Sequence, residues 1–116
     1  EGAPRRCGEF WVLGNQLTSL RGGPNHVEGD YLCHSNPLET LEGLASYIGG
    51  RFRCDITPDL GMLRVLMSNA AEVYDLALLG RPPLTIINKW LPQGKAGLSG
   101  CATELIKAGF RGNARL

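Results

Sequence analysis

A 21-residue period constrains this chain of 116 residues more than any other feature. Gly29 and Gly50 align at this spacing, and each is followed by one charged residue and an apolar-x-apolar pair. One period earlier, Gly8 opens the same pattern. Glycine is frequent, with 16 copies, which favours many short elements joined by tight turns. A period in this range is typical of stacked units that bury one face against the next.

Two units fit one template, apolar-x-apolar-x-x-Asn-x-Leu-x-x-Leu: F-W-V-L-G-N-Q-L-T-S-L-R-G and Y-L-C-H-S-N-P-L-E-T-L-E-G. The alternating apolar pair shares one face of a short strand, and the Asn amide can satisfy backbone groups of the turn and of neighbouring units. The two leucines return the chain to the same core. After Cys54 the pattern decays. The predicted structural positions are Phe10, Val12, Asn15, Leu17, Leu20, Tyr31, Cys33, Asn36, Leu38, Leu41, Phe52 and Cys54.

This pattern predicts an α+β fold, a short leucine-rich-repeat-type β-solenoid of about three units closed by a C-terminal helical cap. The solenoid is expected over residues 1–59 and the cap over residues 60–116. The alternative is a small β-meander with coincidental spacing. Glu1 to Pro4 resembles Arg21-Gly22-Gly23-Pro24, the junction that closes a unit, so further units are expected upstream.

The two units resemble those of leucine-rich-repeat-like proteins encoded by tailed bacteriophages and some bacteria, which run close to G-x-F-x-C-x-x-N-x-L-T-S-L-x-G-x-P. Residues 2–57 carry the resemblance, and the tail with I-I-N-K-W-L matches more loosely. The resemblance implies a cytoplasmic interaction protein in a bacterial host, and it implies no catalytic residue.

Helical signals replace the period after about residue 60. The apolar run from Leu60 to Met67 fits either a buried strand or the start of a helix. Helices are expected from Glu72 to Leu79, from Leu84 to Leu91 after Pro83, and from about Leu98 to Ala108 before Gly109. Helices here would cover the open end of the stack, although an independent domain is the alternative.

The residues offer little for catalysis or metal binding. His34 follows Cys33 directly, so the two side chains point to opposite faces of a strand and form no dyad. No Cys or His spacing suits zinc, and no cofactor is expected. The loop from Gly94 to Gly100 lacks the glycine order of a phosphate-binding loop. Cys101 is either a thiol with a lowered pKa near a helix start or a buried packing residue.

Charge and hydropathy exclude several other partners. The net charge of +1 gives no field that would draw nucleic acid, and no apolar stretch is long enough to span a bilayer. The four cysteines could form two disulfides, but three of them fall at core positions of the pattern, so reduced thiols in a reducing, cytoplasmic setting are expected.

The residues between the apolar strand positions are the candidate partner-binding side chains, on an expected concave strand face. Trp and Arg are enriched at protein interfaces, so a protein partner is expected, whereas the alternative is an ordinary solvated sheet surface. The candidates form three ladders at the 21-residue offset: Trp11, Leu32 and Arg53; Leu13, His34 and Asp55; and Glu9, Asp30 and Arg51.

Three functions remain open on the sequence. The favoured one is a protein–protein interaction module, encoded by a phage and binding a bacterial host component. A second is a structural piece of a virion or of a larger multidomain protein. A third is the substrate-recruiting part of an enzyme whose active site lies outside these residues.

Overall fold

The computed structural model describes residues 6–116, which contain short strands followed by helices. The strands are β1 (Arg6–Cys7), β2 (Phe10–Trp11), β3 (His26–Val27), β4 (Tyr31–Leu32), β5 (Tyr47–Ile48), β6 (Arg51–Arg53) and β7 (Glu72–Tyr74). The α-helices are α1 (Leu84–Trp90) and α2 (Leu98–Lys107), and the 3₁₀ segments are η1 (Leu63–Met67), η2 (Leu76–Leu78), η3 (Leu91–Gly97) and η4 (Arg111–Asn113).

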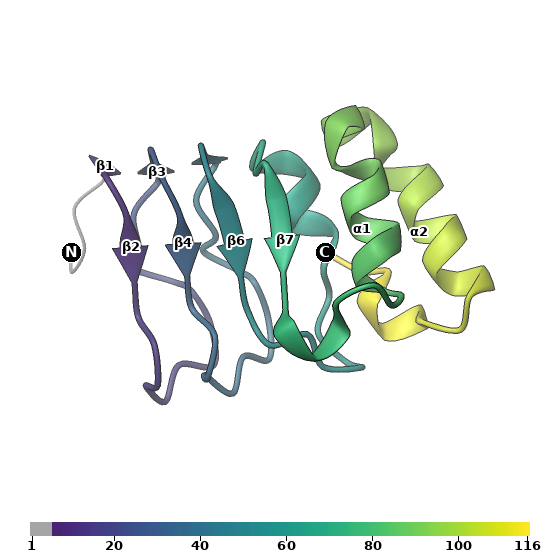
Figure 1. Ribbon diagram of the computed structural model, residues 1–116, viewed down its shortest axis with the longest axis horizontal. Helices are drawn as coiled ribbons and strands as arrows, with labels where there is room; N and C mark the ends of the chain where they lie inside the picture. The colour runs from purple at the N-terminus through teal and green to yellow at the C-terminus, as the bar shows by residue number, and fades with distance from the viewer. Residues whose placement is uncertain (1–5) are drawn as a thin grey trace.

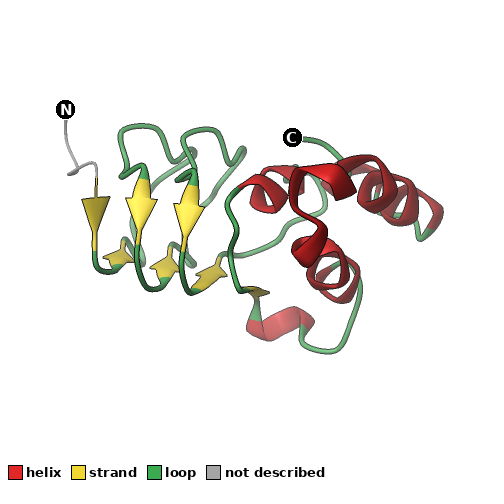
Figure 2. Ribbon diagram, turned by 90° about the horizontal axis from the view of Figure 1, so that it is seen from above, coloured by secondary structure: helices red, strands yellow, loops and turns green. Residues whose placement is uncertain are grey.

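The strands form two parallel sheets. One has the order β1-β3-β5 and the other the order β2-β4-β6-β7, and the two rows of strands are visible in Figures 1 and 2. In the four-stranded sheet Phe10 is level with Tyr31, Tyr31 with Phe52, and Phe52 with Val73. The 21-residue spacing of the sequence is therefore the register of this sheet.

A column of rings fills the space between the sheets. The ring of Tyr31 lies 5.0 Å from that of Phe10 and 5.4 Å from that of Phe52, measured between centroids. Tyr31 and Phe52 are fully buried, as are the thiols Cys33 and Cys54 of the next inward position. Tilted and edge-on ring pairs at this distance are favourable beyond the area they bury.

Asn36 is the buried polar residue that holds two turns of chain together. Its Nδ2 donates to the carbonyl oxygens of Val12 (2.6 Å) and Cys33 (2.9 Å), and its Oδ1 accepts from the amide of Leu17 at 3.3 Å. The role expected for this amide is thus seen at Asn36. Asn15, the equivalent position one unit earlier, is exposed.

The expected fold class, an α+β leucine-rich-repeat-type solenoid, is wrong. The finding that overturns it is the pair of parallel sheets, which pack with the helices into one small α/β body of 39 × 27 × 22 Å. Its radius of gyration of 13.0 Å is that of a compact domain of about this length. The sequence pattern predicts one strand per unit, but His26 and Tyr47, in segments expected to be turns, begin strands of a second sheet.

The C-terminal half differs from expectation at its start. The predicted helix from Glu72 to Leu79 is wrong, because Glu72–Tyr74 is strand β7 and only Leu76–Leu78 forms a 3₁₀ turn. The apolar run after Leu60 gives η1 instead of a strand. The two later helices are confirmed as α1, which follows Pro83, and α2, which ends before Gly109 in the left-handed region (φ +97°).

Helix α1 terminates the four-stranded sheet. Asn88 accepts a hydrogen bond from the amide of Val73 (2.7 Å) and donates one to the carbonyl of Val73 (2.9 Å). The side-chain amide thus satisfies the outer edge of β7 as the next strand would, which protects the edge from pairing with other chains. None of the helices in residues 6–116 has the length and hydropathy to cross a membrane.

Candidate protein-binding face

The outward side chains of the four-stranded sheet form the candidate site. Trp11, Leu32, Arg53 and Tyr74 are level with one another across β2, β4, β6 and β7. Successive strand residues point to opposite sides, so this row faces away from the buried row of Phe10, Tyr31, Phe52 and Val73. We call the side chains on this side of the sheet the outer face. It consists of Glu9, Trp11, Leu13, Asp30, Leu32, His34, Arg51, Arg53, Asp55, Glu72 and Tyr74.

Apolar groups on the outer face are unusually exposed. Trp11 is 63% exposed and Leu13 is 42% exposed. Beyond the end of β7, Leu76 is 57% exposed and Leu79 is 49% exposed. Single exposed apolar residues need no explanation, but these four lie along one sheet and its margin.

The aromatic ring of Tyr74 organises the two arginines of β6. The guanidinium carbon of Arg51 lies 5.5 Å from the ring centroid, and that of Arg53 lies 5.4 Å from it. Cation–π contacts of this kind orient the guanidinium groups. Sequence reasoning missed Tyr74 because the repeat template decays after Cys54. The available signal was the offset itself, since Glu72-Val73-Tyr74 stands 21 positions after Arg51-Phe52-Arg53.

The row of Glu9, Asp30 and Arg51 is partly structural. Asp30 Oδ1 accepts a hydrogen bond from the backbone amide of Arg51 at 2.9 Å, and its Oδ2 lies 3.7 Å from the Arg51 guanidinium. Glu9, the residue just before β2, is the exposed member of the same row. Asp30 therefore joins two strands, and the charge of Arg51 is compensated within the face.

The row of Leu13, His34 and Asp55 lies just beyond the strands. Asp55 Oδ2 accepts a hydrogen bond from the amide of Ser35 at 2.9 Å, and Ser35 has the left-handed backbone (φ +64°). Burial and then the charge of Arg53 lower the pKa of His34, so its imidazole is neutral near pH 7. Asp55 thus fixes the turn while keeping its negative charge, which is the one charge that this row adds to the face.

The thiols and imidazoles of residues 6–116 include buried, neutral thiols and a stacked imidazole. Burial raises the pKa of Cys33 to about 12 and that of Cys101 to about 11, so both remain neutral thiols. For Cys101 the packing interpretation fits, because its side chain is fully buried on α2. His26 and Tyr47 both lie on the three-stranded sheet, where their rings stack with centroids 4.6 Å apart. Residues 6–116 contain no group of three or more His, Cys, Asp or Glu placed to hold a metal ion.

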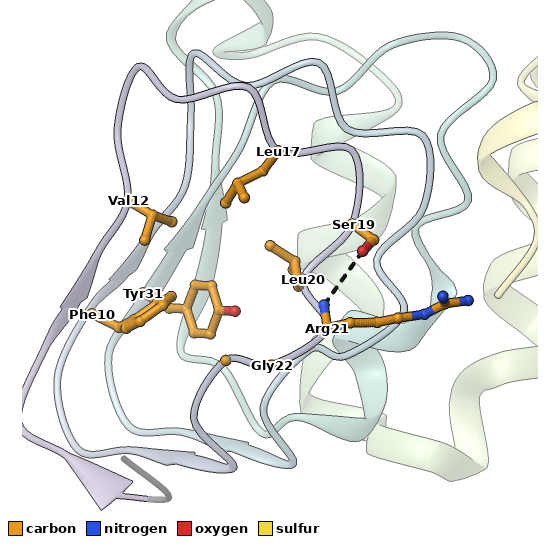
Figure 3. A pocket seen from close by; sticks show the side chains of 9 residues that line it. Phe10, Val12, Leu17, Ser19, Leu20, Arg21, Gly22 and Tyr31 are labelled. Atoms are coloured by element: carbon orange, nitrogen blue, oxygen red, sulfur yellow. Dashed lines mark hydrogen bonds between the residues drawn. The ribbon is translucent and has the colours of Figure 1, made fainter. Parts of the chain in front are cut away.

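A hollow of about 140 Å³ opens at the end of the molecule that carries β2 (Figure 3). Its walls are Phe10, Val12, Leu17 and Tyr31, and Arg21 lies at its margin. The guanidinium of Arg21 is paired with Glu42 at 2.6 Å. The hollow is mostly apolar, and the Tyr31 hydroxyl on its wall is buried without a hydrogen-bond partner in the part of the chain that the structure describes.

The segment from Gly94 to Gly100 forms the end of η3 and the start of α2. Gly97 and Gly100 are there for packing, because a Cβ at either position would meet the ring of Trp90 within 3.2 Å. Trp90 in turn donates its indole N–H to Glu104 at 2.8 Å. The segment thus joins η3 to α2 by close packing against Trp90.

Comparison of the chain with protein-family models, with curated proteins and with solved structures finds no match.

Proposed function

We propose that this chain is a non-catalytic protein-binding module that contacts its partner through the outer face of the four-stranded sheet. The observation that carries the proposal is the row formed by Trp11, Leu32, Arg53 and Tyr74, which presents two large aromatic groups and one guanidinium on a rigid sheet. Tyr, Trp and Arg are the residue types that dominate binding energy at protein interfaces.

The exposure of the row supports this role. A 63% exposed indole is unfavourable in water, and covering it with a partner would recover free energy at about 25 cal/mol per Å² of apolar surface. Arg53 already lies against the Tyr74 ring, so less of its conformational entropy would be lost on association.

The resemblance of the two sequence units to phage and bacterial interaction proteins points to a bacterial host component as the partner. A structural role in a virion or in a larger protein is the second candidate, and the same exposed row would then contact a neighbouring subunit. The recruiting part of an enzyme is the weaker third, and it predicts turnover by a longer protein that this chain alone lacks.

A pull-down from bacterial lysate, read by quantitative mass spectrometry, tests the proposal with three baits: the wild type, Trp11→Ala and Tyr47→Ala. Tyr47 is a matched control because it is an aromatic residue, 38% exposed, on the other sheet. We expect a partner retained by the wild type and by Tyr47→Ala and lost by Trp11→Ala. Equal recovery by all three baits, or loss only with Tyr47→Ala, would contradict the proposal.

A further inference from the structure

The arginines of the outer face differ in how their charges are compensated. Arg51 lies 3.7 Å from the carboxylate of Asp30. Arg53, two residues further along β6, has no ion pair within residues 6–116. The nearby carboxylate of Asp55 already accepts the amide of Ser35. Arg53 is therefore a half-buried guanidinium without an anionic partner.

Arg53 lies between an apolar and an aromatic side chain. Leu32 is level with it on one side and Tyr74 on the other, and its guanidinium carbon lies 5.4 Å from the Tyr74 ring. The ring restricts the side chain before a partner arrives. A carboxylate that reached this position would form a charge-assisted hydrogen bond with the guanidinium, which is stronger than a bond between neutral groups.

The charge of the whole face selects among possible anions. The carboxylates of Glu9, Asp30, Asp55 and Glu72 outnumber the two guanidinium groups on it. A polyanion such as nucleic acid would be repelled by this surplus of negative charge. A segment with one carboxylate meets far less of this repulsion than a polyanion, and its pairing with Arg53 would be local, with apolar flanking side chains covering Trp11 and Tyr74.

We infer that the partner presents a peptide segment in which one Asp or Glu, flanked by apolar residues, pairs with Arg53. This inference rests on the proposed function and adds the chemistry of the recognised segment. Arg53 is the specificity-determining residue, and Trp11 and Tyr74 receive the flanking apolar side chains.

Selection of a displayed random-peptide library on the wild-type chain, followed by fluorescence anisotropy with the synthetic winners, tests the inference. We expect winners that carry an Asp or Glu between apolar residues. Replacing that acid by its amide weakens binding to the wild type by roughly tenfold or more. With Arg53→Gln the acid and amide peptides bind alike, whereas Arg6→Gln, an arginine change on the three-stranded sheet, still distinguishes them.

Three results would overturn the inference. The selected peptides could lack a carboxylate, or no peptide could be selected at all. In the third, replacing the acid by its amide would weaken binding equally for Arg53→Gln and the wild type. The proposed function is judged separately by Trp11→Ala. If that variant abolishes peptide binding while Arg53→Gln leaves it intact, the outer face binds peptide but does not select for an acid. Circular dichroism of each variant establishes that it is folded.

Discussion

Single buried polar groups decide how adjacent turns of this chain are held together. Asn36 exchanges hydrogen bonds with the backbone at Val12, Leu17 and Cys33, of which the bond to Cys33 is buried and the other two are partly buried. Removing the amide would leave a buried backbone donor and acceptors unpaired, which is more costly than losing the bonds themselves. Asn36 therefore has a structural role in joining adjacent turns of the chain.

Asn36→Ala should lower the free energy of unfolding by about 2–4 kcal/mol, because several buried groups lose their partners at once. Asn15→Ala is the control, since Asn15 occupies the equivalent position but is exposed. Its effect should stay within about 0.5 kcal/mol. Urea denaturation followed by circular dichroism measures both, and similar losses for the two variants would contradict the assigned role of Asn36.

The raised pKa values of the buried thiols predict how the stability of the fold changes at alkaline pH. Burial raises the pKa of Cys33 from 9.0 to about 12 and raises that of Cys54 well above 9.0. In the unfolded chain these thiols ionise at their ordinary pKa, so above about pH 9 the unfolded state binds fewer protons than the folded state. Stability should therefore be complete below that pH and fall as the pH rises toward 12.

Urea midpoints at about pH 8 and about pH 10 check this prediction, and Cys33→Ala should show a smaller decrease between them. Two results would contradict the assignment of Cys33 as a buried, neutral thiol. One is a urea midpoint that rises with pH. The other is a decrease between the two pH values that is as large in Cys33→Ala as in the wild type.

At the scale of elements, the end of the sheet depends on α1. The two hydrogen bonds between the side-chain amide of Asn88 and the backbone of Val73, one accepted and one donated by Asn88, take the place of a neighbouring strand. The buried side chains of α1, among them Leu84 and Ile87, belong to the same hydrophobic cluster as Val73. The helix and the last strand therefore stabilise each other.

Asn88→Ala should destabilise the chain by about 1–3 kcal/mol and speed hydrogen exchange at the amide of Val73. Thr85→Ala, an exposed change on the same helix, should leave that exchange rate unaltered. Unchanged protection of Val73 in Asn88→Ala would mean that the strand edge does not depend on this side chain.

Sequence reasoning located some of these elements and missed others for identifiable reasons. The column of Phe10, Tyr31 and Phe52 was found because large apolar residues recur at a constant offset. Strands β3 and β5 were missed because two-residue strands carry no internal alternation, and their Asn-, Gly- and Ser-rich neighbours indicate turns.

Strand β7 was mistaken for a helix because the sequence from Glu72 to Leu79 carries helix-forming residues and lacks the Asn and Leu positions of the template. Its strand character comes from pairing with β6, a tertiary interaction that overrides local propensity. The same error hid Tyr74 from the candidate site, whereas the nine partner-binding residues were selected from the offset alone and their role stays a proposal.

At the scale of the whole molecule, one hydrophobic cluster runs from the strands into the helices. It includes Val27 and Tyr31 near one end and Ile87 and Leu105 near the other. The strands and helices should therefore unfold together in a single transition.

Fluorescence and circular dichroism can compare the two halves. In a Trp11→Phe variant, fluorescence reports Trp90 on α1, while far-ultraviolet circular dichroism reports all elements. We expect coincident urea transitions, and a fluorescence transition clearly separated from the circular dichroism transition would show that the helices unfold independently.

Site-specific photocrosslinking tests the binding role of the outer face most directly. A photoreactive phenylalanine derivative replaces Trp11 in one variant and Tyr47 in a second, and each is irradiated in bacterial lysate. Both positions are exposed, and they lie on different sheets. We predict one discrete protein adduct from position 11 and none from position 47. An adduct from position 47 alone, or from neither position, would contradict a partner bound on the outer face.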